Sequence, residues 1–265
     1  MAADFILPSE FITLAHRMAD AASAVIKPAF RNPDIIVETK FDHSPVTAID
    51  RAAEEKMRAI LSQARAHDSV MGEEFGGADV GAEYHWILDP IDGTKAFTLG
   101  RTNFGCLIGL HHIEHGFVLG VADQPITGDR WVGIKGQGAT RNNKVLKSGA
   151  LTTAANARVS ITNPLRHTEK MHQLHEHLLG KVQFMHYGGD FLNYTGIADG
   201  AVHLNFETEQ KIYDVAALIP IISEAGGVMT EMDGTVLTRT PKTQTILAAC
   251  TPQLHAELLK LYRSF

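Results

Sequence analysis

Apolar side chains recur every three or four positions between residues 9 and 30, which is the spacing of one face of an α-helix. That face consists of Phe11, Leu14, Ala15, Met18, Ala22, Val25, Ile26 and Phe30. Ser9 directly follows a proline and is predicted to cap this helix. A second inward-facing stripe, Met57, Ile60, Leu61 and Ala64, predicts a helix that begins near Asp50.

Shorter apolar segments then replace the helical pattern and predict strands. These segments are 69–72, 84–88, 104–111, 116–123 and 129–134. The glycine-rich stretch 133–138 lies between strand-like segments and opens no helix, so it predicts a hairpin turn rather than a nucleotide-binding loop. The expected first lobe, residues 1–150, is therefore an α+β unit with helices on an antiparallel sheet.

A polar stretch at 148–156 predicts a join between two lobes. Beyond it, strand-like segments alternate with helical ones, which predicts an α/β lobe over residues 151–265. The expected strands are 158–162, 182–186 and 228–231, and the expected helices are 168–179, 191–198 and 215–225. The pair Gly226 and Gly227 predicts a left-handed end to the last helix.

Composition narrows the class of protein. Hydrophobic residues make up 45% and charged residues 20%, as in soluble globular proteins, and a net charge of -6 argues against nucleic-acid binding. The sequence has no apolar run of about 18 residues and no signal-like start, so we expect no membrane span and a cytoplasmic location. Cys106 and Cys250 lie in apolar surroundings and are predicted to be buried thiols, as suits a reducing compartment.

The chain has 14 histidines, which raises the question of a metal site. His172 and His175 are three residues apart, and His111, His112 and His115 form a loose group. Neither group has an HExxH-like pattern, and both lie among charged or polar residues. We therefore expect these histidines to be surface side chains rather than metal ligands.

The segment 85–97 carries the most informative pattern. An apolar run predicts a buried strand that ends in Asp89 and Asp92, with Pro90 fixing the backbone between them. Gly93 follows, and then an apolar pattern that could begin a helix. Carboxylates at the end of a strand suit a hard cation, and a glycine that exposes backbone N–H groups suits a phosphate. Taken alone, the segment also fits an ordinary Asp-Pro turn.

Three further acids lie in similar settings. Glu73 is the first of a glutamate pair after a strand-like run, Asp50 lies at the start of a helix, and Asp214 is the only acid at the start of an apolar helix. Taken singly, they also fit a solvated turn, a helix-dipole acid and an N-cap, respectively.

Together, the Gly-Glu-Glu step at 72–74, the Asp-Pro-Ile-Asp-Gly-Thr step at 89–94 and the Tyr-Asp-Val-Ala step at 213–216 resemble the inositol monophosphatase-like family of metal-dependent, lithium-sensitive phosphatases. The resemblance runs from about Lys40 to Met229. It implies a layered αβαβα sandwich of the inositol monophosphatase and fructose-1,6-bisphosphatase type, and commonly a homodimer.

The resemblance also implies roles for residues. One Mg²⁺ would be held by Glu73, Asp89 and the Ile91 carbonyl, a second by Asp89, Asp92 and Asp214, and a third, weaker ion would lie near Glu73. Asp50 and Thr94 would orient and deprotonate the attacking water, and the Gly93 and Thr94 N–H groups would hold phosphate oxygens. Four carboxylates that close would raise one another's pKa values, and divalent cations with all-oxygen ligands would relieve the repulsion.

Within the family, Lys95-Ala96-Phe97 resembles the histidinol-phosphatase branch. Asp190 and Glu207 stand where the family contacts the alcohol, and two acids there favour a cationic substrate such as histidinol phosphate. Glu209 and Ile212 depart from that branch's pattern. An inositol-1-monophosphatase of broad specificity is the alternative, followed by an adenosine 3′,5′-bisphosphate phosphatase and a non-catalytic Mg²⁺ or phosphate sensor.

Overall fold

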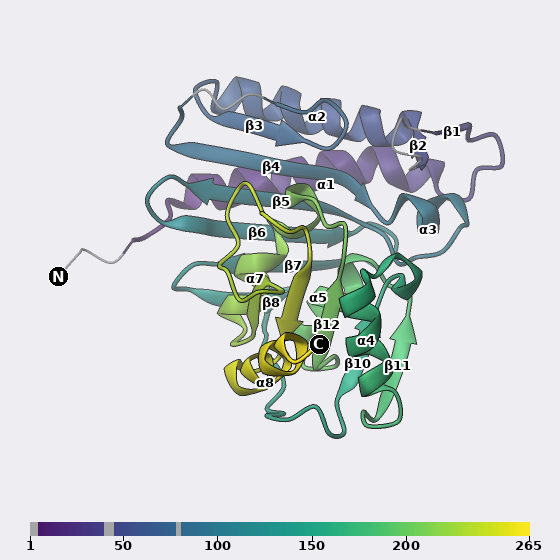
Figure 1. The fold of residues 1–265 in the computed structure, drawn as a ribbon. Helices are drawn as coiled ribbons and strands as arrows, with labels where there is room; N and C mark the ends of the chain where they lie inside the picture. Colours follow the sequence, from purple (N-terminus) through teal and green to yellow (C-terminus); the bar gives the residue numbers. More distant parts are fainter. Residues whose placement is uncertain (1–4, 40–44, 78–80) are drawn as a thin grey trace.

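Two long helices, α1 (Ser9–Ala29) and α2 (Ala48–Ala64), lie side by side over one face of a large sheet in the computed structural model (Figure 1). The structure describes residues 5–39, 45–77 and 81–265, so Lys40, where the family resemblance begins, lies outside them. The predicted stripe of α1 is buried except for Val25 and Phe30, which are partly buried. The prediction of Ser9 as the cap is wrong. Pro8, extended at φ -60 and ψ 139, is the N-cap, and Ser9 begins the helix.

The first sheet has seven strands in sequence order, and its centre is fully buried. They are β3 (Ser69–Gly72), β4 (Tyr84–Asp92), β5 (Gly105–His112), β6 (Gly116–Gln124), β7 (Asp129–Ile134), β8 (Gly138–Arg141) and β9 (Lys144–Val145). The predicted antiparallel pairing is confirmed from β4 to β9. It is wrong for β3 and β4, which are parallel; a parallel pair cannot be joined by a tight hairpin and needs a longer crossover connection. The hairpin between β7 and β8 is confirmed.

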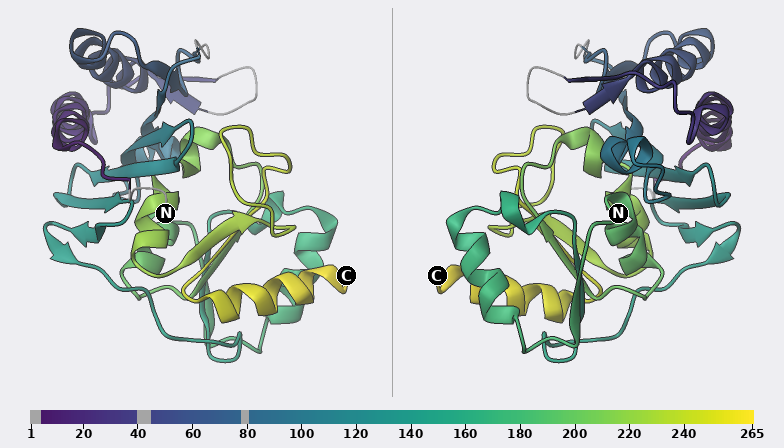
Figure 2. Two further views of the ribbon diagram at one scale, coloured as in Figure 1. Left: turned by 90° about the vertical axis from the view of Figure 1, so that its left-hand side faces the viewer. Right: turned by 90° about the vertical axis from the view of Figure 1, so that its right-hand side faces the viewer.

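The second sheet has the order β11-β10-β12-β14-β13 and mixes parallel and antiparallel pairs. Its strands are β10 (Arg158–Ile161), β11 (Phe184–Tyr187), β12 (Leu204–Glu207), β13 (Val228–Glu231) and β14 (Ile246–Ala249). Helices α5 (Phe191–Ala198) and α7 (Leu218–Glu224) lie between the two sheets, while α4 (Glu169–Leu178) and α8 (Pro252–Arg263) cover the outer face (Figure 2). The predicted αβαβα layering is confirmed.

The predicted helix 215–225 is two helices, α6 (Ile212–Val215) and α7. Pro220 lies in the first turn of α7, where its ring and missing N–H prevent a continuous helix from Asp214 onward. The predicted strand 182–186 is observed as β11, which begins two residues later and ends one residue later. The sequence analysis missed β1 (Val37–Thr39), β2 (Pro45–Thr47), β9, β12, β14, α8 and the single-turn helix η1 (Pro164–Arg166).

The apolar core between the sheets is shared by both halves of the chain. Ile87 and Trp131 from the first sheet belong to the same buried cluster as Phe206 and Leu247 from the second. The two sheets are therefore layers of one packed body, and the division at residue 150 stays a prediction about folding units. Both cysteines are buried thiols, as expected. In the described part of the chain, no helix has the length and apolarity needed to cross a membrane.

Candidate active site

Three carboxylates from two distant segments meet between the sheets. Oxygen atoms of Asp89, Asp92 and Asp214 all lie within 4.8 Å of one another. Residues three apart in a regular strand point to opposite faces. However, the pairing of β4 with β5 shifts register between Asp89 and Asp92, where Pro90 offers no N–H. This irregularity lets both aspartates contribute to one cluster.

Asp214 reaches the cluster because α6 and the start of α7 pack closely on the first sheet. A Cβ added to Gly120 in β6 would lie 1.8 Å from the Ala217 carbonyl oxygen, so only glycine permits this approach. The side chain of Asp214 is fixed locally, since its Oδ2 accepts a hydrogen bond from the Lys211 N–H at 2.7 Å. The sheet surface and the helix cap together set the position of this carboxylate.

The cluster carries strong electrostatic repulsion. Burial, followed by the charges of Glu73, Asp92 and Asp214, raises the pKa of Asp89 well above its ordinary value. Burial and neighbouring aspartates raise the pKa of Asp92 in the same way. Among the described residues, Oδ1 of Asp89 is buried without a hydrogen-bond partner. This all-oxygen set of crowded acids fits a hard divalent cation such as Mg²⁺.

Glu73 is held beside Asp89 by a buried polar network that the sequence analysis missed. Its N–H donates to the Leu88 carbonyl at 3.1 Å, and its side chain shares a hydrogen bond with Asp89. The next N–H, of Glu74, donates to Glu54 Oε2 at 2.7 Å, and Glu54 in turn pairs with Arg58. Glu54 is fully buried on α2. The available signal was its place one turn before Met57, on the inward-facing stripe.

Asp50 and Thr94 form a second polar group next to the carboxylates. Thr94 Oγ1 lies 3.3 Å from Asp50 Oδ1 and 3.1 Å from the Ile91 carbonyl oxygen. Asp50 Oδ2 accepts hydrogen bonds from the N–H and hydroxyl of Thr47, at 2.8 and 2.6 Å. Asp50, Thr94 and Ile91, which were predicted for this part of the site, are therefore brought together. Their chemical roles stay predictions.

Gly93 makes the turn from β4 into α3 (Thr94–Thr98). Its φ of +87° lies in the left-handed region, and a Cβ there would lie 2.7 Å from the Asn103 carbonyl oxygen. The backbone N–H groups of Gly93 and Thr94 thus lie at the start of a helix, beside the carboxylates. Such N–H groups suit phosphate oxygens.

Of the two predicted substrate contacts, Asp190 lies nearer the carboxylates. Its neighbour Phe191 donates its N–H to Asp92 Oδ2 at 2.6 Å, and Asn103 Nδ2 donates to Asp190 Oδ2 at 2.9 Å. Burial raises the pKa of Asp190 to about 6, against the lowering effects of Asn103 and Lys95. Next to this loop lies a cavity of about 740 Å³, lined in part by Asn103, Gly188 and Leu192.

Glu207, the other predicted substrate contact, is almost completely buried. It is 3% exposed, and its Oε1 accepts hydrogen bonds from the Thr162 N–H and from Asn205 Nδ2. Burial raises its pKa to about 7. Its role as a substrate contact stays a prediction.

The prediction that these histidines are surface side chains is wrong for His112, and His111, His115, His172 and His175 are only partly exposed. His112 is 4% exposed, because β5 carries it into the sheet, where its Nε2 lies 3.0 Å from Glu83 Oε1. His172 and His175 are partly buried, and their ring nitrogens come within 4.8 Å of those of His167. The spacing along α4 was visible in the sequence, whereas the approach of His167 was not.

Known proteins match this chain over nearly its full length. A histidinol-phosphatase from Streptomyces coelicolor is 37% identical over 258 residues, covering 94% of this chain and 95% of its own. The chloroplastic bifunctional phosphatase IMPL2 from Arabidopsis thaliana is 37% identical over 84% of this chain. That match covers 65% of the plant protein, so this chain spans less than two thirds of its length.

Solved structures agree with the sequence comparison. An inositol monophosphatase from Zymomonas mobilis superimposes with a TM-score of 0.86 and 37% identity, covering 96% of this chain and 98% of that one. A sequence model of the inositol monophosphatase family matches residues 7–264, beyond both ends of the motif-based resemblance. The chain therefore belongs to the inositol monophosphatase family of phosphatases, which hydrolyse phosphate monoesters.

Proposed function

We propose that this protein is a Mg²⁺-dependent phosphomonoesterase whose substrate is histidinol phosphate. The observation that carries the proposal is the position of Asp190. The Phe191 N–H to Asp92 bond ties its backbone to the carboxylate cluster, and Asn103 orients its side chain. An anionic side chain is thereby held beside the site of phosphate chemistry, where the leaving alcohol must lie.

Asp89, Asp92 and Asp214 would hold the ions, with Glu73 and the Ile91 carbonyl completing the set of two to three sites. When bound, divalent ions neutralise phosphate charge, activate water and stabilise the leaving oxygen. The remaining steps belong to the chain's own residues.

Thr94 and Asp50 would handle the proton of the attacking water. The Thr94 hydroxyl can accept a hydrogen bond from water while it donates to Asp50 Oδ1. Asp50 Oδ2 already accepts two hydrogen bonds from Thr47, so Oδ1 is the oxygen turned toward Thr94. The N–H groups of Gly93 and Thr94 would hold the phosphate. Water then attacks in line, the ester P–O bond breaks, and the alcohol leaves with a proton.

Sequence identity alone does not choose the alcohol, because a histidinol-phosphatase and an inositol monophosphatase both match at 37%. Charge does. Histidinol carries a protonated amine, which an Asp190 carboxylate would bind by a charge-assisted hydrogen bond, whereas inositol is neutral. A pKa of about 6 for Asp190 leaves most of it ionised at neutral pH. Homodimer formation and lithium inhibition remain predictions from the family resemblance, and a cytoplasmic location remains a prediction from the sequence.

The test compares three substrates, histidinol phosphate, inositol 1-phosphate and adenosine 3′,5′-bisphosphate, each with Mg²⁺ and with EDTA. We expect the highest kcat/KM on histidinol phosphate, and no turnover in EDTA. Asp190→Asn should raise KM for histidinol phosphate by roughly 10- to 100-fold, the value of one charged hydrogen bond, and leave KM for inositol 1-phosphate nearly unchanged. A preference for inositol 1-phosphate would overturn the substrate assignment, and inactivity on all three would favour the sensor.

A further inference from the structure

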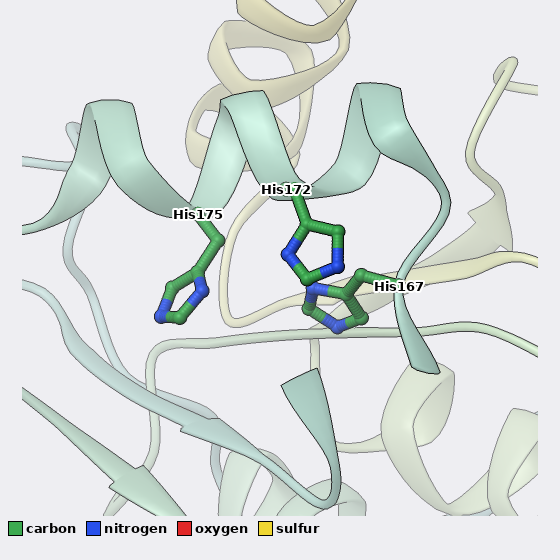
Figure 3. Close-up of side chains that lie close together, drawn as sticks. All are labelled: His167, His172 and His175. Atoms are coloured by element: carbon green, nitrogen blue, oxygen red, sulfur yellow. The ribbon is translucent and has the colours of Figure 1, made fainter. Parts of the chain in front are cut away.

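Three histidines gather on the outer side of the second sheet (Figure 3). His167 lies just after η1, and His172 and His175 lie about one turn apart on α4. One ring nitrogen from each lies within 4.8 Å of those of the other two. The group is separate from the carboxylates. The histidines pack on the outer face of β12, where the ring centroid of Phe206 lies 5.4 Å from that of His167. The next residue, Glu207, points to the opposite face of the strand, which is the inner side of the sheet.

His167 is a buried imidazole without the partners that burial requires. It is 7% exposed, and neither of its ring nitrogens makes a well-formed hydrogen bond within the described ranges 5–39, 45–77 and 81–265. The Phe206 backbone raises the pKa of His167 slightly, against the larger effects of burial and of the neighbouring histidines. A buried donor or acceptor left unpaired costs roughly 1–3 kcal/mol. The unpaired ring therefore destabilises the folded protein, and a ligand that binds the ring would remove this destabilisation.

The two helical histidines lie beside the ring of His167. His172 and His175 are partly buried, and Figure 3 shows their rings on the same side of α4 as the ring of His167. His175 Nε2 lies 2.8 Å from the Tyr187 hydroxyl, so the helix is also linked to the end of β11. Burial lowers the pKa values of His167 and His175, the former to about 4, so both are neutral at physiological pH. Neutral imidazole is the form that binds metals.

We infer that His167, His172 and His175 form a binding site for a divalent transition metal of the zinc class, distinct from the magnesium site. Three imidazoles suit Zn²⁺, Co²⁺ or Ni²⁺ and disfavour Mg²⁺, which prefers oxygen. Tetrahedral ligands at about 2.0–2.1 Å place their nitrogens roughly 3.4 Å apart. Metal binding would therefore draw the ring nitrogens closer together than the 4.8 Å within which they now lie. In bound zinc sites the second ring nitrogen of a histidine commonly donates to a carboxylate, a backbone carbonyl or water.

A metal bound at this site would link three segments of the chain. A metal there joins the connection after η1 to α4 and, through the His175–Tyr187 contact, to the end of β11. The residues that follow Tyr187 are Gly188, Gly189 and Asp190. The inference does not depend on the proposed substrate, because none of the three histidines belongs to the carboxylate cluster.

The experiment uses tag-free, full-length protein stripped with EDTA and returned to a large excess of Mg²⁺, which competes with Zn²⁺ for the carboxylates. Zn²⁺ is titrated by calorimetry, and Co²⁺ by its visible absorption, which is intense for tetrahedral nitrogen ligation. We expect one equivalent to bind. His172→Ala and His175→Ala should each weaken binding by at least about 100-fold, the upper range for loss of a supporting partner. His177→Ala, on the same helix but outside the cluster, should bind as wild type.

Two further readouts separate this site from the catalytic one. Asp89→Asn should keep the zinc equivalent, because it alters only the carboxylates. Zn²⁺ should raise the Tm of wild type and His177→Ala but not that of His172→Ala, whose own Tm in EDTA shows whether it folds. If His172→Ala does not fold, His175→Gln replaces it. No bound equivalent in wild type, or equal binding by the cluster variants, would overturn the inference.

Discussion

Thr94 Oγ1 lies 3.3 Å from Asp50 Oδ1, although the two residues are 44 positions apart and belong to different helices. The contact joins the first turn of α2 to the first residue of α3. It is oriented from both sides, since Thr47 holds the other Asp50 oxygen and the Ile91 carbonyl lies 3.1 Å from the Thr94 hydroxyl. Few positions of the hydroxyl satisfy all these contacts.

Replacing Thr94 by valine should abolish proton transfer while preserving shape. Valine fills the same volume but lacks the hydroxyl, so we expect kcat to fall by roughly 100-fold or more, with a smaller change in KM. Steady-state kinetics with saturating Mg²⁺ measures this split. Thr94→Ser keeps the hydroxyl and should retain most of the activity. A Thr94→Val enzyme with near-normal kcat would show that Asp50 does not act through this residue.

Gly72→Ala should disturb the metal site from a distance. An added Cβ would lie 1.8 Å from Glu54 Oε1, and Glu54 holds the Glu74 N–H next to Glu73, the proposed metal ligand. Overpacking of this kind costs about 1–3 kcal/mol of unfolding free energy. Urea unfolding should show that loss, and the Mg²⁺ concentration for half-maximal activity should rise.

The matched variant for Gly72→Ala is the double substitution Gly72→Ala with Glu54→Ala. Removing the Glu54 carboxylate removes the clash, so the two effects on stability should not add. Additive losses would mean that the Gly72 substitution acts by another route, such as strain in β3.

The sequence predicted the helices and turns whose formation depends on residues close together in the chain. The α1 stripe was correct because amphipathic spacing reports burial directly, and the β7–β8 hairpin was correct because glycines mark a turn. β12 and β14 were missed, since each has four residues and gains its stability from non-local pairing.

The same limit applies to the site. The acids at 89, 92 and 214 were singled out by residue type and order, but their meeting depends on a register shift in β4 and on a glycine in β6. The approach of His167 to α4 depends on a turn and on packing against Phe206. Neither relationship has a signal in sequence spacing.

The stability of the metal-free protein should fall as pH rises. The pKa values of Asp89 and Asp92 are raised in the folded state by burial and by their acidic neighbours. A raised folded pKa contributes stability that is complete below the unfolded value, here 3.8, and is lost as pH rises through the folded value. In EDTA, the contribution of Asp89 and Asp92 to the Tm should therefore decrease as the pH rises above 3.8.

Two measurements check this assignment. Asp89→Asn should flatten the dependence, because the amide does not titrate. Mg²⁺ should restore stability, by about 2.7 kcal/mol at 100 times its Kd, with the larger gain at higher pH where the carboxylates are ionised. A metal-free Tm that rises over this range would contradict the raised pKa values.

Asn103→Ala should alter substrate affinity through Asp190 without touching the metal ligands. The Asn103 hydrogen bond lowers the pKa of Asp190, so its loss should move that pKa above its present value of about 6. More of the carboxyl group is then protonated at neutral pH, and KM for histidinol phosphate should rise there. At higher pH Asp190 ionises in both enzymes, so the two KM values should converge.

The pH profile of KM, with kcat followed separately, distinguishes this charge effect from general disruption. Asp190→Asn should show no such titration in KM, and inositol 1-phosphate, which carries no cationic group, should give nearly parallel profiles for wild type and Asn103→Ala. If Asn103→Ala instead lowers kcat equally on both substrates at every pH, the asparagine supports the turn that carries Gly93 rather than the charge of Asp190.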